Sequence, residues 1–308
     1  MGRPRIVLDC DPGIDDAFAI LCALRYCDLV AVTTVSGNAP IEHTTRNALH
    51  VLELAASPVP VHQGAGAPLV ARPAFAESVH GAAGLGDEPT PPPHTRPAST
   101  DAVAAIAHLL EREPLSIVAT GPLTNIARLV AQHPDLTERV PRIFWMGGST
   151  EAGNTTTSAE FNSWADPHAV AAVFASGVPV TMFGLNLTRQ VRVGADHAER
   201  LRAAATPTSL RAAVFLEFYE SHGVRDGLGQ PMHDPCAVLG ASHSDVFTVA
   251  ASNIVVHTSD DDSRGRTEVR ESADERTQRV DVAARADATA AIDLILAAAA
   301  DPRPSHNG

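Results

Sequence analysis

The chain of 308 residues is long enough for about one large domain or two small ones, and its 44% hydrophobic and 19% charged residues are typical of a soluble globular protein. Its formal net charge of −13, without any basic run, argues against nucleic acid as a partner, because binding to phosphates needs clustered cations. All 23 basic residues are arginine. Catalysis by a lysine amine, as in Schiff-base enzymes, is therefore excluded.

The cysteines and the hydropathy of the chain bear on its compartment. Cys10, Cys22, Cys27 and Cys236 lie in apolar segments and form no Cys-x-x-Cys pair, which indicates buried free thiols rather than a zinc site or disulfides. The apolar run Ile6–Leu8 is too short for a signal peptide, and no run approaches the ~18 residues of a membrane span. We expect a cytoplasmic protein with no membrane partner.

In chain order, short β-branched runs alternate with alanine-rich helical stretches. The predicted strands are Ile6–Leu8, Leu29–Val35, Ser116–Ala119, Ile143–Met146 and Val178–Phe183, and the predicted helices include Asp15–Arg25, Thr44–Ala56, Ala102–Glu111, Leu123–Gln132 and Pro167–Ala175. Such alternation predicts βαβ crossovers. We therefore expect an α/β fold with a mostly parallel central sheet covered by helices on both faces.

Nothing in the sequence marks a second domain. There is no internal repeat and no break in composition, so we expect one domain over residues 1–308. The polar tail at 301–308 contains two prolines and is expected to be frayed. The segments 81–100 and 222–231 are rich in turn-forming residues, and we expect them to be mobile loops that act as lids.

Polar residues follow several of the predicted strands. They are Asp9, Asp11, Asp15 and Asp16 after the first strand, Ser36–Asn38 after the second, Ala119–Pro122 after a later one and Met146–Gly148 after another. Ligands of parallel sheets bind at the carboxyl ends of the strands. We therefore expect all four ends to face one crevice.

The four aspartates between Asp9 and Asp16 concentrate negative charge that needs a counter-charge if it is buried. Ligands that offer only oxygen favour Ca²⁺ or Mg²⁺ over zinc. The alternative is a set of capping aspartates that the amides and dipole of the following helix satisfy. Pro12 and Gly13 fit either interpretation, because the chain must turn sharply between strand and helix.

Several other polar segments are ambiguous when each is taken alone. Asp234, after His233, either caps a helix or adds a carboxylate to the metal site. Asn38 is compatible with a simple turn, and the segment 160–162 with an exposed start of a helix. His80 by itself would be an ordinary loop histidine.

Taken together and in order, these segments resemble the signatures of the inosine-uridine preferring nucleoside hydrolases. The segments are Asp-Cys-Asp-Pro-Gly-Ile-Asp-Asp-Ala at 9–17, Ser-Gly-Asn at 36–38, His-Gly at 80–81, Ala-Thr-Gly-Pro-Leu-Thr-Asn-Ile-Ala at 119–127, Met-Gly-Gly at 146–148, Ala-Glu-Phe-Asn-Ser-Trp-Ala-Asp-Pro at 159–167 and His-Asp-Pro-Cys at 233–236. The resemblance covers nearly the whole chain and is weakest after about Val256. It implies a hydrolase that cleaves the N-glycosidic bond of ribonucleosides into ribose and a free base.

The resemblance also implies a role for each matching residue. Asp11, Asp16, Asp234 and the carbonyl of Thr120 would hold a Ca²⁺ ion that also binds a water and the ribose hydroxyls, with Asp11 taking the proton of that water. Asp15, Asn38, Asn154, Glu160 and Asn162 would hold the ribose hydroxyls, Met146 would line the sugar pocket and Phe161 would pack against the nucleoside. His233 would assist departure of the base, with His80 nearby. Homodimers or homotetramers are expected.

Two alternative interpretations compete with this resemblance. Asp9-Cys10-Asp11 also resembles the first motif of haloacid dehalogenase phosphohydrolases, but Pro12 follows it and the lysine of that family is missing. A non-catalytic nucleoside- or sugar-binding protein of the same fold stays open as an alternative. No tryptophan stands beside His80 or within 222–231, and His233 is present, so the resemblance favours the broad-specificity branch over the purine-specific one.

Overall fold

The computed structural model describes residues 2–81, 83–86, 91–223 and 226–303. Over these ranges the main sheet has nine strands, in the spatial order β10 (Thr267–Arg270), β9 (Phe247–Val256), β11 (Gln278–Ala286), β6 (Val180–Phe183), β5 (Ile143–Met146), β4 (Ser116–Ala119), β1 (Arg5–Cys10), β2 (Asp28–Thr34) and β3 (Val61–Gln63). All neighbours from β3 to β11 are parallel, and β9 is antiparallel to both β11 and β10. The predicted mostly parallel sheet is confirmed.

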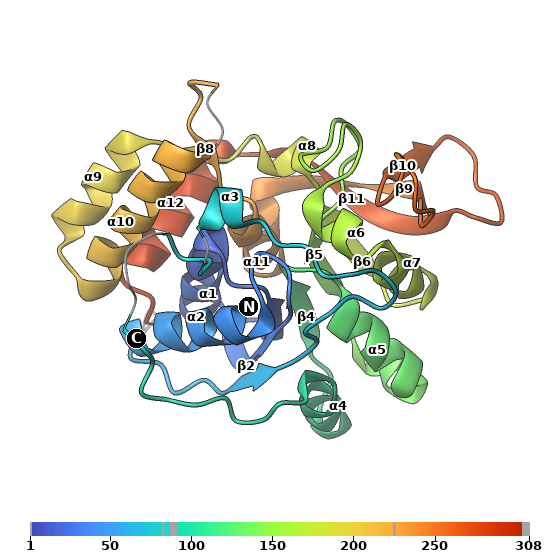
Figure 1. Cartoon of the computed structure of the whole chain (residues 1–308), viewed down its shortest axis with the longest axis horizontal. Coiled ribbons are helices and arrows are strands. Elements are labelled where there is room, and N and C mark those ends of the chain that lie inside the picture. Colours follow the sequence, from blue (N-terminus) through green and yellow to red (C-terminus); the bar gives the residue numbers. More distant parts are fainter. Residues whose placement is uncertain (1, 82, 87–90, 224–225, 304–308) are drawn as a thin grey trace.

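Helices cover both faces of this sheet (Figure 1). They are α1 (Ile14–Tyr26), α2 (Ile41–Leu54), α3 (Glu77–His80), α4 (Ala102–Arg112), α5 (Thr124–Gln132), α6 (Phe161–Ala165), α7 (Pro167–Ala175), α8 (Leu185–Thr188), α9 (Ala195–Ala204), α10 (Pro207–His222), α11 (Asp234–Ser242) and α12 (Ala288–Ala300). A separate two-stranded ladder pairs β7 (Arg192–Val193) with β8 (Gln230–Pro231). The α/β architecture with two covered faces follows the prediction.

The two layers of helices create two hydrophobic cores. One core contains residues of α1, α10, α11 and α12, and the other contains residues of α4, α5 and α7. Strand β1 contributes to both, because successive side chains point to opposite faces: Ile6 and Leu8 belong to the first core and Val7 to the second. A strand buried on both faces reads as a continuous apolar run.

The predicted elements differ from the observed ones mainly at their ends. The prediction for α7 is confirmed at both ends, whereas β6 begins two residues later than predicted, at Val180. Strand β1 continues to Cys10, so Asp9 lies within the strand. The antiparallel strands β9, β10 and β11 were not predicted. Residues 248–251 of β9 are exposed, which breaks the buried β-branched pattern that identifies the parallel strands.

Other expectations concern thiols, membranes, loops and the tail. All four cysteines are free and buried, as predicted. No helix in the described ranges is both long enough and apolar enough to cross a membrane. Of the loops predicted to be mobile, residues 82, 87–90 and 224–225 lie outside the described residues, and so does most of the predicted frayed tail, at 304–308.

Candidate active site

A large cavity opens where β2, β1, β4 and β5 end. Its volume is about 730 Å³, which is within the usual range for a small-molecule site. Asp15, Asn38, Thr120 and Met146 line it, and each of these residues follows or ends one of the four strands. The prediction that the four polar strand ends face one crevice is confirmed.

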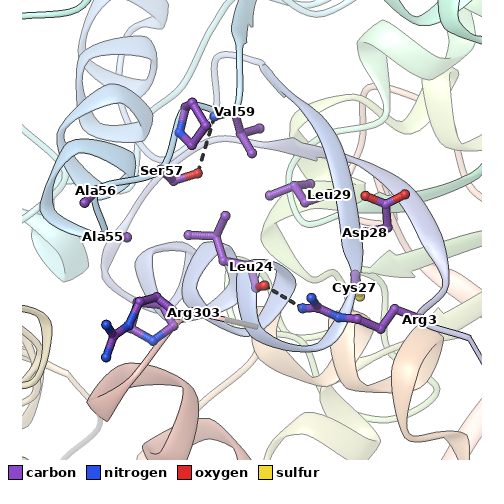
Figure 2. A pocket seen from close by; sticks show the side chains of 12 residues that line it. Arg3, Leu24, Cys27, Asp28, Leu29, Ala55, Ala56, Ser57, Val59 and Arg303 are labelled. Carbon is purple, nitrogen blue, oxygen red and sulfur yellow. Dashed lines mark hydrogen bonds between the residues drawn. The ribbon is translucent and has the colours of Figure 1, made fainter. Parts of the chain in front are cut away.

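A smaller cavity of about 260 Å³ lies at the opposite ends of the strands, near the amino ends of β1 and β2. Figure 2 shows its lining, which is apolar apart from side chains such as Asp28 and Arg3. The guanidinium of Arg3 donates to the carbonyl of Leu24 and is already used by the fold. In the described ranges, no cluster of carboxylates or imidazoles lines this cavity. The larger cavity is therefore the candidate active site.

Three aspartates come together beside the larger cavity, and two of them, Asp15 and Asp234, line it. Oxygens of Asp15, Asp16 and Asp234 all lie within 4.8 Å of one another, and the three side chains are buried. Asp15 and Asp16 belong to the first turn of α1, and Asp234 begins α11. The fold thus joins carboxylates more than 200 positions apart in the chain.

Asp16 carries most of the hydrogen bonds of this cluster. It accepts from the backbone N–H of Gly13 at 2.9 Å, the hydroxyl of Thr120 at 2.8 Å and the side-chain amide of Asn38 at 3.1 Å. The bond from Gly13 is a cap at the start of α1, so the capping interpretation holds for this residue. It does not extend to the neighbouring Asp11, which retains an oxygen that is unpartnered within the described part of the chain.

Asp11 is fully buried beside the cluster. Its Oδ2 accepts from the backbone N–H of Asn38 at 2.7 Å, whereas Oδ1 has no hydrogen-bond partner among the described residues. A Cβ on Gly37 would come 2.0 Å from Oδ2, and one on Gly121 would come 2.8 Å from Oδ1. Two strand ends therefore close around this carboxylate, and only glycine leaves enough space at either position.

The electrostatics of the cluster favour a bound cation. Burial, together with the charge of Asp16, raises the pKa of Asp11 well above its usual value and raises that of Asp15 to about 7. The pKa of Asp234 is raised for the same reasons. The unpartnered Oδ1 of Asp11 and the convergence of oxygen donors fit a hard metal ion. The carboxylate oxygens of this site are therefore suitable ligands for a metal ion.

Asp9 does not belong to the cluster, which corrects the reading of four aspartates as one site. Its Oδ1 accepts from the Thr33 hydroxyl at 2.6 Å and from the Asn125 side-chain amide at 2.8 Å. Because β1 extends to Cys10, the side chain of Asp9 points to the same face as Val7. Burial raises its pKa to about 6.

The residues predicted to bind ribose all line the cavity. Glu160 caps α6 and accepts the N–H groups of Gly148, Asn162 and Ser163, while burial raises its pKa to about 7. It begins a helix as one interpretation expected, but it is 2% exposed rather than on the surface. The side-chain amide of Asn162 donates to the carbonyls of Thr120 and Met146, which leaves its Oδ1 available to a ligand.

Three other predicted residues that line the cavity differ in their burial. Asn154 is exposed to solvent and lines the cavity, and its Oδ1 accepts from the N–H of Phe161 at 3.0 Å. The ring of Phe161 also lines the cavity, 6.4 Å from the ring of Trp164. Met146 is 3% exposed and ends β5 at the cavity.

Three imidazoles line the cavity, those of His80, His222 and His233, and the first and last of these were predicted. His80 ends α3 and is buried, and its Nδ1 accepts from the N–H of Ile14 at 3.1 Å, so a neutral ring carries its proton on Nε2. It is therefore not the ordinary loop histidine that its sequence context suggested. His233 precedes α11, and its Nδ1 lies 2.7 Å from the hydroxyl of Thr188. Burial lowers the pKa of His80 to about 4 and that of His233 to about 3.

Comparison with known proteins shows the family to which the chain belongs. The sequence model of the family described as inosine-uridine preferring nucleoside hydrolase matches residues 6–293. This chain belongs to that family. A pyrimidine-specific ribonucleoside hydrolase RihA of Shewanella sp. (strain ANA-3) is 40% identical over 278 residues, which are 87% of each chain. The protein of the same name from Escherichia coli O8 (strain IAI1) is 39% identical over 272 residues, 86% of this chain and 88% of its own.

Solved structures agree with the family assignment. The plant nucleoside hydrolase PpNRh1 superposes with a TM-score of 0.91 at 29% identity, over 97% of this chain and 99% of its own. The purine-preferring ribonucleoside hydrolase from Gardnerella vaginalis gives a TM-score of 0.90 at 28% identity, over 97% and 98%. The resemblance seen in the sequence motifs is confirmed, and this chain is a nucleoside hydrolase.

The cavity of this nucleoside hydrolase contains residues that sequence reasoning missed. They are Phe75, Trp164, Arg189, Arg192, Tyr219, His222 and Asp226. Trp164 follows Phe161 by three positions on α6, so helical spacing was a usable signal for it. Tyr219, whose ring lies 6.0 Å from that of His80, gave no such signal, because only the packing of α10 against α3 brings the two together.

Proposed function

We propose that this nucleoside hydrolase uses a calcium ion and the residues of the 730 Å³ cavity to hydrolyse ribonucleosides into ribose and a free base. The observation that carries this proposal is the buried group of Asp15, Asp16 and Asp234 beside Asp11, whose Oδ1 has no partner among the described residues. Buried carboxylates in such number call for a cation that accepts many oxygen ligands.

Asp11, Asp16, Asp234 and the carbonyl of Thr120 would hold the ion. All four positions offer oxygen only, which favours Ca²⁺ over zinc. When bound, the ion supplies positive charge that binds the ribose hydroxyls and makes a nearby water easier to deprotonate. The hydroxyl of Thr120 donates to Asp16. Its carbonyl accepts one hydrogen bond from the side-chain amide of Asn162, which leaves a second lone pair for a ligand.

The protein's own groups then divide the reaction between them. Asp11 accepts the proton of the attacking water, and the carbonyl and carboxylate oxygens around the ring stabilise positive charge that develops on the ribose. Asp15, Asn38, Asn154, Glu160 and Asn162 hold the ribose hydroxyls, with Met146 and Phe161 packing against the nucleoside. His233 donates a hydrogen bond to the departing base, and His80 lies on the same side. Attack opposite the base inverts the anomeric carbon.

A preference for pyrimidine ribonucleosides is supported by the names of the 40% and 39% identical relatives. Turnover of inosine, uridine, cytidine, adenosine and a few ribosylated vitamins, followed by release of reducing sugar, tests both the activity and the preference. Uridine and cytidine are expected to be hydrolysed with the highest kcat/KM. Tight binding of nucleosides without release of sugar would instead support a non-catalytic binding protein.

The calcium proposal predicts a stability that depends on both metal and pH. Chelation with EDTA at pH 8 is expected to lower Tm by about 5 °C, because a ligand of the native state stabilises it by mass action. In the metal-free protein, Asp15 keeps its proton up to about pH 7, whereas the unfolded chain loses that proton near 3.8. The stability of the metal-free protein therefore falls as pH rises from about 4 to 7. Over the same range, the stability that Ca²⁺ binding adds increases.

Differential scanning calorimetry at pH 5 and pH 8, with and without Ca²⁺, measures this dependence. Elemental analysis gives the metal content, expected to be one Ca²⁺ per chain. Absence of any divalent metal together with an unchanged Tm in EDTA at pH 8 would count decisively against a metal site.

The ribose assignment predicts strong discrimination against 2′-deoxynucleosides. A deoxyribose removes a hydroxyl from both the ion and Asp15, and the buried groups left without a partner make the complex unfavourable. We expect kcat/KM for deoxyuridine to be lower than for uridine by a factor of roughly 10⁴. Comparable values for the two substrates would contradict the placement of the sugar.

Three further proposals concern the whole protein. We propose that residues 1–308 act as one domain, supported by β1 and β11 belonging to the same sheet. Four buried free thiols support a reducing, cytoplasmic location. A homodimer or homotetramer is proposed on the resemblance to the family, and light scattering of the purified protein checks it.

A further inference from the structure

Thr188, the last residue of α8, lies outside every motif that the sequence analysis singled out. Its side chain is fully buried, and its hydroxyl oxygen is 2.7 Å from Nδ1 of His233. The two residues are 45 positions apart in the chain. They meet because α8 directly follows β6, and α11 begins at the same end of the strands.

Backbone hydrogen bonds hold the segments of these two residues together. The N–H of Val191 donates to the carbonyl of Thr188 at 3.1 Å, and the carbonyl of Val191 accepts from the N–H of Met232 at 2.8 Å. The adjoining β7–β8 ladder pairs Arg192 with Pro231. Backbone hydrogen bonds therefore join the residues that follow Thr188 to the residues that precede His233.

The direction of this hydrogen bond follows from the burial of the hydroxyl. Among the described residues, Nδ1 of His233 is the one partner of the Thr188 hydroxyl. If Nδ1 carried the proton, the hydroxyl hydrogen would be buried without an acceptor, which is unfavourable. Thr188 therefore donates and Nδ1 accepts, so the neutral ring carries its proton on Nε2. His233 lines the cavity, and Nε2 is its remaining nitrogen.

We propose that Thr188 is a positioning residue that sets the tautomer and the orientation of His233, so that Nε2–H is presented to the departing base. The inference rests on the proposed role of His233 in the reaction. Thr188 itself contacts neither the base nor the carboxylate cluster in this account. Its contribution is expected only where the leaving group needs a hydrogen bond from His233.

The substitution Thr188→Val keeps the shape of the side chain and removes the hydroxyl, while Thr188→Ser is the matched control that keeps it. Losing a group that orients a functional imidazole typically costs roughly 10- to 100-fold. We expect T188V to lower kcat on uridine by that factor with little change in KM. On p-nitrophenyl riboside, whose phenolate departs unaided, we expect less than a twofold change, and T188S should resemble the wild type on both substrates.

Two measurements separate positioning from a merely structural role. In the His233→Ala background, T188V should have no further effect on uridine, because the ring that it orients is gone. The ¹⁵N chemical shifts of the His233 ring should identify the Nε2–H tautomer in the wild type and in T188S, and a mixture of tautomers in T188V. A lowered Tm with unchanged ring shifts would indicate a structural role and overturn the proposal.

The kinetic outcomes also separate this inference from the proposed function. If His233→Ala is selective for uridine and T188V is silent or slows both substrates alike, only the role of Thr188 fails. If His233→Ala slows both substrates equally, the proposed role of His233 fails and the role of Thr188 in turnover fails with it. An additional loss from T188V when His233 is already alanine would likewise overturn the inference.

Discussion

Replacing Asp11 with asparagine is expected to lower kcat by roughly 10²- to 10⁴-fold on every riboside tested. The amide keeps the shape and can still accept the N–H of Asn38, now 2.7 Å from Oδ2. It cannot accept a proton from water, and it is a weaker ligand for a cation. Because these losses precede any contribution of the leaving group, uridine and p-nitrophenyl riboside should be slowed alike.

Asp9→Asn is the matched control for this variant. Like Asp11, Asp9 is buried, but it lies within β1, and its carboxylate bonds to Thr33 and Asn125 outside the cluster. An asparagine there can keep the accepting oxygen, so we expect kcat to change by less than about tenfold, with the effect appearing mainly in Tm. Steady-state rates and calcium content of both variants check the comparison. A D11N protein that turns over ribosides at nearly the wild-type rate would remove Asp11 from the role of base.

The second large effect is expected for His233→Ala, and it should depend on the leaving group. A hydrogen bond to the base matters when the base leaves poorly, so kcat on inosine or uridine should fall by roughly 10²- to 10⁴-fold. p-Nitrophenyl riboside should be nearly unaffected. Steady-state kinetics on the two classes of substrate give the contrast directly.

A structural role for His233 gives a different pattern. If the ring only orients the adjacent Asp234 in the cluster, its loss disturbs the metal site and slows both substrates by the same factor. The same variants at His80 then become informative, because His80 lines the cavity and holds its Nε2–H in the same way, through the N–H of Ile14. Equal losses for H233A together with selective losses for His80→Ala would transfer the assisting role to His80.

Much of the fold was predictable because the pattern of apolar and polar residues within each element indicates its type. A parallel strand buried on both sides, such as β4, is apolar at its buried positions Ile117, Val118 and Ala119, and the following helix shows its own period. The polar residues after β1, β2, β4 and β5 stood out against those runs, so the shared crevice could be predicted as well. The antiparallel strands β9–β11 could not, since residues 248–251 of β9 are exposed and lack that contrast.

The sequence by itself determined the α/β fold, the four polar strand ends and, through the order of its motifs, the family. Only the tertiary structure decided which groups serve the site. It separated Asp9 from Asp11, because β1 ends at Cys10 and the Asp9 carboxylate bonds to Thr33 and Asn125. It also made Glu160 a buried cap of α6 and brought Trp164 and Tyr219 to the cavity. The contact between Thr188 and His233 has no local signature, because a hydrogen bond across 45 positions depends on how α8 and α11 pack rather than on the spacing of residues along the chain.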